Sequence, residues 1–270
     1  MRHVRLRRPI AGLWALGLGA TAAAVSLGVG LNEVRLALFA ATLLVEILAL
    51  VFVLRGRAHL QPSDEGRRTW TLLAAALTAR LLAELRVGLL YLDAVPGFIA
   101  DRPALMNLFV YVLRYLYTLA DLLLLAGLWT ARRSFDRSGL GYPLRRRDLG
   151  ALALLAPLPL LVWLAQDAMQ VSADPGIFTF RLVSVVVGSV VSALCLGLAS
   201  TSLQMGGGVL AWIWGGLATA GIARVFAFVA ASGLQALGWA SVSVVEQGFL
   251  WTFACAWLLA AGLHWRLCRA

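Results

Sequence analysis

The sequence predicts an all-α fold, a polytopic transmembrane helical bundle with about eight spans. Two observations support this class. Hydrophobic residues make up 61% of the chain and charged residues only 13%, with a mean hydropathy of +0.85. A soluble globule needs more polar surface than that. The apolar residues also form eight long runs, and each run has the ~20 residues needed to cross a ~30 Å hydrocarbon layer.

The predicted spans are separated by short polar segments. Pro157 and Pro159 fall in the fifth span and predict a kink or a shortened helix there. The link between the first two spans, 32–35, is expected to be tight. Polar stretches reach only about 17 residues, so residues 1–270 are predicted to form a single integral membrane domain. The spans are Ile10–Gly30, Leu36–Leu54, Thr69–Leu92, Pro103–Ala131, Leu149–Gln166, Ile177–Leu203, Gly206–Gly233 and Trp239–Trp265.

The arginines predict the orientation. If the spans alternate, sixteen arginines lie on one side of the membrane and only Arg35 and Arg102 on the other, which indicates cytoplasmic termini. The basic run before the first span is followed by 21 uncharged residues, too many for a signal-peptide core, so we expect this helix to be retained. Trp70, Trp129, Trp239 and Trp265 lie near span ends and are predicted to be interfacial anchors.

The basic residues also bear on origin and function class. The net charge is +10, but the basic residues lie mostly between spans, which is not a nucleic-acid footprint. All 23 are arginine, which is typical of a GC-rich genome and favours a bacterial cytoplasmic membrane. Without lysine no Schiff base can form, so a retinal pigment is excluded.

A duplication of four plus four helices is predicted. Arg35 and Arg80 recur at offsets of 146 and 144 residues as Arg181 and Arg224. The two halves, 1–136 and 145–270, would be joined by an arginine-rich cytoplasmic loop. Because four spans per half is an even number, both halves would point the same way across the membrane.

Nine ionisable residues lie inside the apolar runs. Each costs roughly 2.5–3.5 kcal/mol at the centre of a membrane helix, so each needs a partner, a cavity or a ligand. They are Glu46, Arg80, Glu84, Arg86, Arg114, Asp121, Arg181, Arg224 and Glu246.

The second, third and fourth spans each have a polar face, and these faces lie at a common depth in the membrane. Arg80 and Glu84 are one helical turn apart and can pair, and Glu46, Arg80 and Arg114 lie near the midplane. The fourth span carries a stripe at i, i+4, i+7, i+11 and i+14, formed by Asn107, Tyr111, Arg114, Thr118 and Asp121.

This pattern predicts a pocket in which two guanidiniums hold a small anionic or zwitterionic ligand. Its candidate ligand-binding residues are Glu46, Arg80, Glu84, Asn107, Tyr111, Arg114 and Asp121. A self-satisfied network that fixes helix packing is the alternative interpretation. Arg224 and Glu246 lie at similar depths and are predicted to form a structural ion pair.

No catalytic, metal or cofactor site is predicted. A bundle of four plus four helices is similar in architecture to haem A synthase and other membrane b-type haem proteins, but those need intramembrane histidines. His3, His59 and His264 all lie outside the spans or at a cytoplasmic end. The three cysteines lack metal-binding spacing, and the H-E-x-x-H and G-x-S-x-G signatures are absent from the sequence.

An enzyme is possible only through the carboxylates, and three non-enzymatic functions are favoured. The first is a binding or sensing protein for the small ligand. The second is a structural subunit of a larger membrane complex, and the third is a transporter or permease component. The expected partners are the lipid bilayer, the small anionic ligand and other membrane proteins, with no nucleic acid.

Overall fold

The computed structural model describes residues 4–28, 30–91, 115–138, 175–204, 208–236 and 241–269, together with positions 104, 108 and 150. Seven helices and no strands occur in these residues, which confirms the all-α class. The helices are α1 (Val4–Leu27), α2 (Leu31–Ala58), α3 (Glu65–Tyr91), α6 (Tyr115–Arg137), α9 (Pro175–Gln204), α10 (Gly208–Ala236) and α11 (Val242–Arg269).

Five of these helices are long and apolar enough to cross a membrane, so the chain is an integral membrane protein. They are α1, α2, α9, α10 and α11, over Pro9–Leu27, Leu31–Ala58, Val185–Gln204, Gly208–Ala231 and Ser243–Arg269. The other two, α3 and α6, carry Arg80, Glu84 and Asp121. The predicted fifth span lies outside the described residues, so the count of eight remains a prediction.

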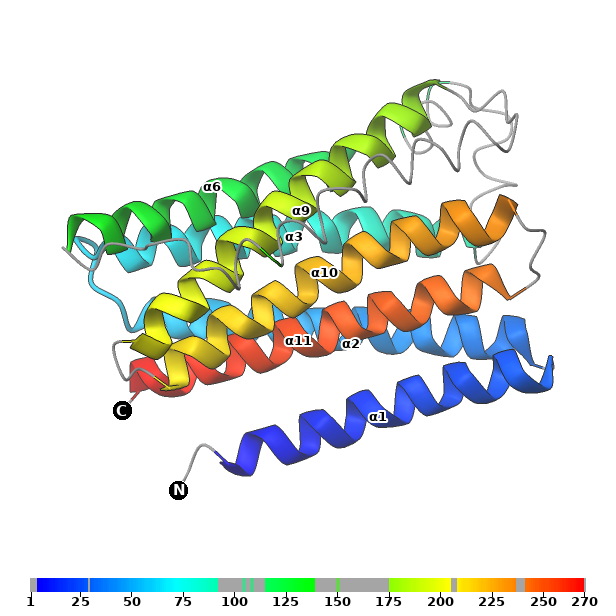
Figure 1. Ribbon diagram of the computed structural model, residues 1–270, viewed down its shortest axis with the longest axis horizontal. Helices are drawn as coiled ribbons and strands as arrows, with labels where there is room; N and C mark the ends of the chain where they lie inside the picture. The colour runs from blue at the N-terminus through cyan, green and yellow to red at the C-terminus, as the bar shows by residue number, and fades with distance from the viewer. Residues whose placement is uncertain are drawn as a thin grey trace.

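Six helices form a closed ring. Neighbours around it are α2, α3, α6, α9, α10 and α11, and α11 packs back against α2. Helix α1 lies outside the ring, mainly against α11, and the helices run roughly along one axis (Figure 1). The start of α1 and the end of α11 lie at the same end of the bundle (Figure 1). The ring encloses a core whose largest fully buried side chains include Trp257 and Phe253.

The turn between α1 and α2 lies closer to the N-terminus in the chain than the predicted link, 32–35. Gly28 and Gly30 have φ of 64° and 62°, a left-handed conformation that glycine adopts without strain. Helix α2 therefore begins at Leu31, and the predicted link, 32–35, forms its first turn. Glu33 in that turn is favourable, because a carboxylate near a helix N-terminus interacts with the helix dipole.

Trp70 is not an interfacial anchor, and this prediction was wrong. Its side chain is buried, and its ring centroid lies 3.6 Å from that of His264 and 6.4 Å from that of Trp214. His264 in turn contacts Gly56 so closely that a Cβ there would lie 2.6 Å from the imidazole Cδ2. Tertiary packing of α2, α3, α10 and α11 thus buries rings that end-of-span position alone would leave at the interface.

Helices α3 and α6 are also linked at the end where α3 begins. Arg137 donates a hydrogen bond to Glu65. The Ser134 hydroxyl and the Arg137 guanidinium hold the pKa of the Glu65 carboxyl below its usual range. Because the pair is exposed to solvent, it adds little to the stability of the bundle.

We predict that Gly17→Ala weakens the docking of α1 on α11. A Cβ at Gly17 would lie 2.1 Å from the Trp251 Nε1, and overpacking of this kind costs about 1–3 kcal/mol. The matched control is Gly19→Ala, where a Cβ meets nothing within 4 Å. Disulfide trapping between cysteines placed on α1 and α11 should fall for Gly17→Ala and stay unchanged for Gly19→Ala. Equal trapping in both variants would contradict the packing.

Candidate functional site

A buried triad joins α2 and α3. Arg80 donates from Nε to Glu46 Oε1 and from Nη2 to Glu84 Oε1, each at 3.0 Å. The three residues are exposed by 3%, 0% and 5% for Arg80, Glu46 and Glu84. Arg80 and Glu84 meet because residues four apart share a face of α3, and α2 packs alongside. The structure thus brings together three residues that the sequence predicted to cluster.

A second buried ion pair joins α6 and α10. The Arg224 guanidinium donates to the Asp121 carboxylate from both Nη atoms. Nη1 donates to Oδ1, and Nη2 donates to Oδ2 at 2.9 Å. This bidentate geometry adds both energy and specificity to the contact between an arginine and a carboxylate. Asp121 is 2% exposed and Arg224 is 4% exposed. The pair connects two helices that are not neighbours in the ring, so it spans the interior of the bundle.

This pair corrects the predicted partner of Arg224. The sequence paired Arg224 with Glu246 because the two lie at similar depths. In the structure the carboxylate that Arg224 binds belongs to Asp121, and Glu246 lies partly buried in the second turn of α11. Depth along the helix is set by sequence position, but the direction in which a residue points across the bundle depends on helix rotation.

The two ion pairs border one small void. Arg80 and Arg224 both line a cavity of about 10 Å³, together with Phe253 and Trp257 of α11. That is about the volume needed for one water molecule. An organic anion therefore does not fit between the two arginines.

Aromatic rings cover the guanidiniums. The Arg80 Cζ lies 4.0 Å from the centroid of the Phe253 ring and 6.0 Å from that of Tyr117, and the Arg224 Cζ lies 5.7 Å from that of Phe228. A cation above an aromatic face in a desolvated site is stabilised by about 2 kcal/mol. These contacts offset part of the cost of burying the arginines.

Two buried acceptors near the triad are left without hydrogen-bond partners. Glu46 uses Oε1 for Arg80, whereas its Oε2 has no partner. Thr42, one turn earlier on α2 and 3% exposed, has a hydroxyl without a partner. Both side chains lie on the buried face of α2. Buried polar atoms are nearly always satisfied, so these two mark a place for a proton, a cation or a water.

The rest of the predicted pocket lies outside the described residues. Asn107, Tyr111 and Arg114, which the sequence placed with the cluster, belong to this part, and their role stays a prediction. The structure adds Phe253 and Trp257, which sequence reasoning missed. Both lie in an apolar run of α11, where only their contact with the arginines distinguishes them from other core residues.

The side chains do not form a metal centre in the part of the chain that the structure describes. Groups of three or more His, Cys, Asp or Glu with metal-binding geometry are absent from these residues. Cys195 and Cys255 are buried free thiols, and Cys268 lies 3.6 Å from the His264 ring. No protein-family model, curated protein or solved structure matches this chain.

Proposed function

We propose that this protein is a non-enzymatic multi-pass membrane protein that binds a proton or a small cation at Glu46, as a transporter or sensor component. One observation carries the proposal. The Glu46 side chain is completely buried, and one of its two carboxylate oxygens has no hydrogen-bond partner. Ionisable residues inside a membrane bundle commonly mark ion or proton pathways.

The contacts of Glu46 favour a positive ligand. Glu46 and Glu84 both bind the guanidinium of Arg80, and the Glu46 Oε2 has no partner, whereas Asp121 and Arg224 balance each other. An uncompensated buried carboxylate costs several kcal/mol, and a bound proton or cation removes that cost. The charged groups that act on Glu46 are Arg80 and Glu84 on α3 and Arg224 on α10. On α11, which also packs against α2, Cys255 is a buried thiol.

The small anionic or zwitterionic ligand predicted from the sequence receives less support. Both arginines near the void already bind carboxylates, and the buried Arg224 Nε is left as a donor without a hydrogen-bond partner. An anion site would have to use Asn107, Tyr111 and Arg114, and it stays a prediction for that region.

A structural subunit of a membrane complex is the second candidate. The observation in its favour is the small size of the void that Arg80 and Arg224 line, about 10 Å³. A network of this kind rigidifies a bundle without binding anything. Protonation or cation binding at Glu46 separates the two candidates, because a purely structural network has no need of either.

The order of the ring supports the proposal of duplicated halves. If the ring is rotated about its own axis by three helix positions, α2, α3 and α6 fall on α9, α10 and α11 in that order. The same operation relates Arg80 on α3 to Arg224 on α10, the two arginines that border the central void. The proposed site therefore lies near the axis between the halves. From the arginine distribution, we propose that both termini are cytoplasmic and that the membrane is bacterial.

We predict that Glu46→Gln abolishes a protonation or cation-binding signal. The protein is reconstituted in vesicles of phosphatidylethanolamine and phosphatidylglycerol, and infrared difference spectra are recorded between two pH values and between sodium and potassium buffers. The wild type should show a change in a carboxyl band that Glu46→Gln removes. Glu33→Gln, at an exposed position on the same helix, is the matched control and should keep the band.

Two outcomes would decide against this function. If the folded wild type shows no carboxyl change under either condition, Glu46 binds neither a proton nor a cation, and the structural role remains. If Glu46→Gln and Glu33→Gln give the same spectra as the wild type, the signal arises at another carboxylate.

A further inference from the structure

We infer that a groove between α1 and α10 binds an acyl chain of a membrane lipid, at a site separate from the charged interior. The α1–α10 groove is made of two cavities of about 430 and 410 Å³. Trp14 and Thr219 line both cavities, so the two lie side by side along α10.

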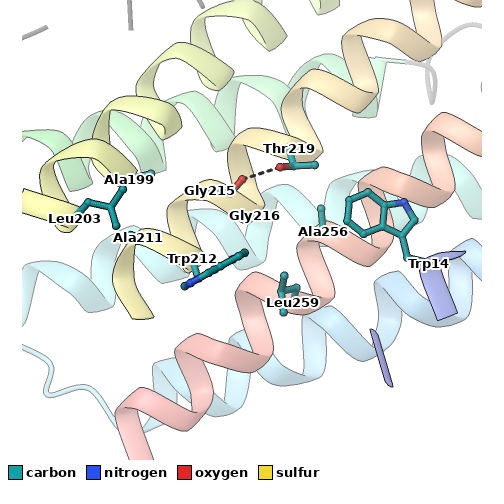
Figure 2. A pocket seen from close by; sticks show the side chains of 10 residues that line it. All are labelled: Trp14, Ala199, Leu203, Ala211, Trp212, Gly215, Gly216, Thr219, Ala256 and Leu259. Carbon is teal, nitrogen blue, oxygen red and sulfur yellow. Dashed lines mark hydrogen bonds between the residues drawn. The ribbon is translucent and has the colours of Figure 1, made fainter. Parts of the chain in front are cut away.

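The groove exists because α1 is held away from α10. Helix α1 packs against α11 and α2, and α11 forms the floor of the groove. Figure 2 shows the indole of Trp14 on one side, Gly215 and Thr219 of α10 on the other, and Ala256 of α11 between them. Gly215 leaves space here, since a Cβ at this position would meet nothing within 4 Å.

The threonine hydroxyls in the groove and the Trp14 indole are already bonded within the protein. The Thr219 hydroxyl donates to the carbonyl of Gly215 at 2.9 Å, and the Thr21 hydroxyl donates to that of Gly17 at 2.9 Å. Thr252 donates to the carbonyl of Gly248 at 3.1 Å and accepts the Trp14 Nε1–H at 3.1 Å. These donors are therefore not offered to a polar ligand, and the walls around them are apolar. The occupant that this lining suits is a hydrocarbon.

The surroundings and size of the groove favour a lipid chain. The four helices that line it, α1, α9, α10 and α11, are all candidate membrane spans. From Ala211 to Phe226 it follows α10 for about 22 Å, at 1.5 Å per residue. An acyl chain is thin and flexible enough to lie along this length of the groove.

The test uses a phosphatidylethanolamine with a photoactivatable acyl chain. The full-length protein is reconstituted with this probe in vesicles of phosphatidylethanolamine and phosphatidylglycerol, moved to detergent to remove loosely held lipid, and then illuminated. Mass spectrometry of the digest locates the adducts. We expect them to concentrate on the peptides that carry Trp14, Thr219 and Phe249.

Filling the groove should remove these adducts. Gly215→Phe places a ring in the open space, and Gly215→Leu fills it with a smaller side chain in case the larger one perturbs folding. The matched control is Gly12→Phe on α1, where a Cβ also meets nothing within 4 Å and which does not line the groove. Adducts should be lost in the Gly215 variants and retained in Gly12→Phe, with thermal unfolding showing that each variant is folded.

Three results would overturn the inference. Adducts that are equally abundant at Leu44 and Leu48, which are exposed on α2, would show only a general lipid coat. Retention of the groove adducts in both folded Gly215 variants would place the chain elsewhere. Absence of adducts from the groove of the folded wild type would show that no acyl chain occupies it and would leave a partner helix as the occupant.

Discussion

Arg80→Leu is expected to destabilise the bundle by about 3–5 kcal/mol, because it leaves two buried carboxylates without their shared cation. The structure explains the size of this effect. Arg80 is 3% exposed and holds both Glu46 and Glu84 at 3.0 Å, and its guanidinium also lies against the Phe253 ring. The loss should appear as a lower free energy of unfolding in detergent micelles.

The double substitution Arg80→Leu/Glu46→Leu should recover much of this loss, since it removes the arginine together with its fully buried partner. Recovery is expected to be partial, because Glu84 keeps its charge. The matched control is Arg68→Leu, at an exposed position in the first turn of α3, which should change stability little. If the double variant costs the sum of the two single variants, Arg80 and Glu46 are not coupled.

Asp121→Leu is expected to have a similar cost, about 3–5 kcal/mol, because it leaves the buried Arg224 guanidinium without a counter-charge. Arg224→Leu strands the Asp121 carboxylate in the same way. The double variant Asp121→Leu/Arg224→Leu should restore much of the stability, since it replaces a buried ion pair by apolar side chains. A double-mutant cycle of unfolding free energies measures the coupling.

Two controls accompany this cycle, one for an exposed carboxylate and one for Glu246, the partner of Arg224 that the sequence predicted. Asp136→Leu changes an exposed carboxylate on the same helix, whose contact with Arg132 is 3.8 Å long, and should cost little. The combination Glu246→Leu/Arg224→Leu tests the partner predicted from the sequence. Strong coupling of Arg224 to Glu246, and none to Asp121, would contradict the ion pair across the ring.

Much of the interior triad follows from the sequence by itself. Arg80 and Glu84 are one turn apart on α3, so the helical repeat alone brings them together. The depth of Glu46 follows from counting 1.5 Å per residue from the ends of the span, and α2 and α3 are joined by a short connection. Composition and the apolar runs likewise determine the helical membrane class. These features depend on local geometry and on the hydrocarbon thickness.

Other features depend on tertiary structure alone. By depth the sequence paired Arg224 with Glu246, whereas the rotation of α10 toward α6 places Arg224 against Asp121. The groove between α1 and α10 exists because α1 docks on α11 beside the ring. The order of the helices along the chain does not by itself determine this docking. A sequence sets the height of each residue and its face on its own helix. Which helix lies opposite that face is determined by packing, because the ring order and helix rotations are fixed only when all side chains are fitted together.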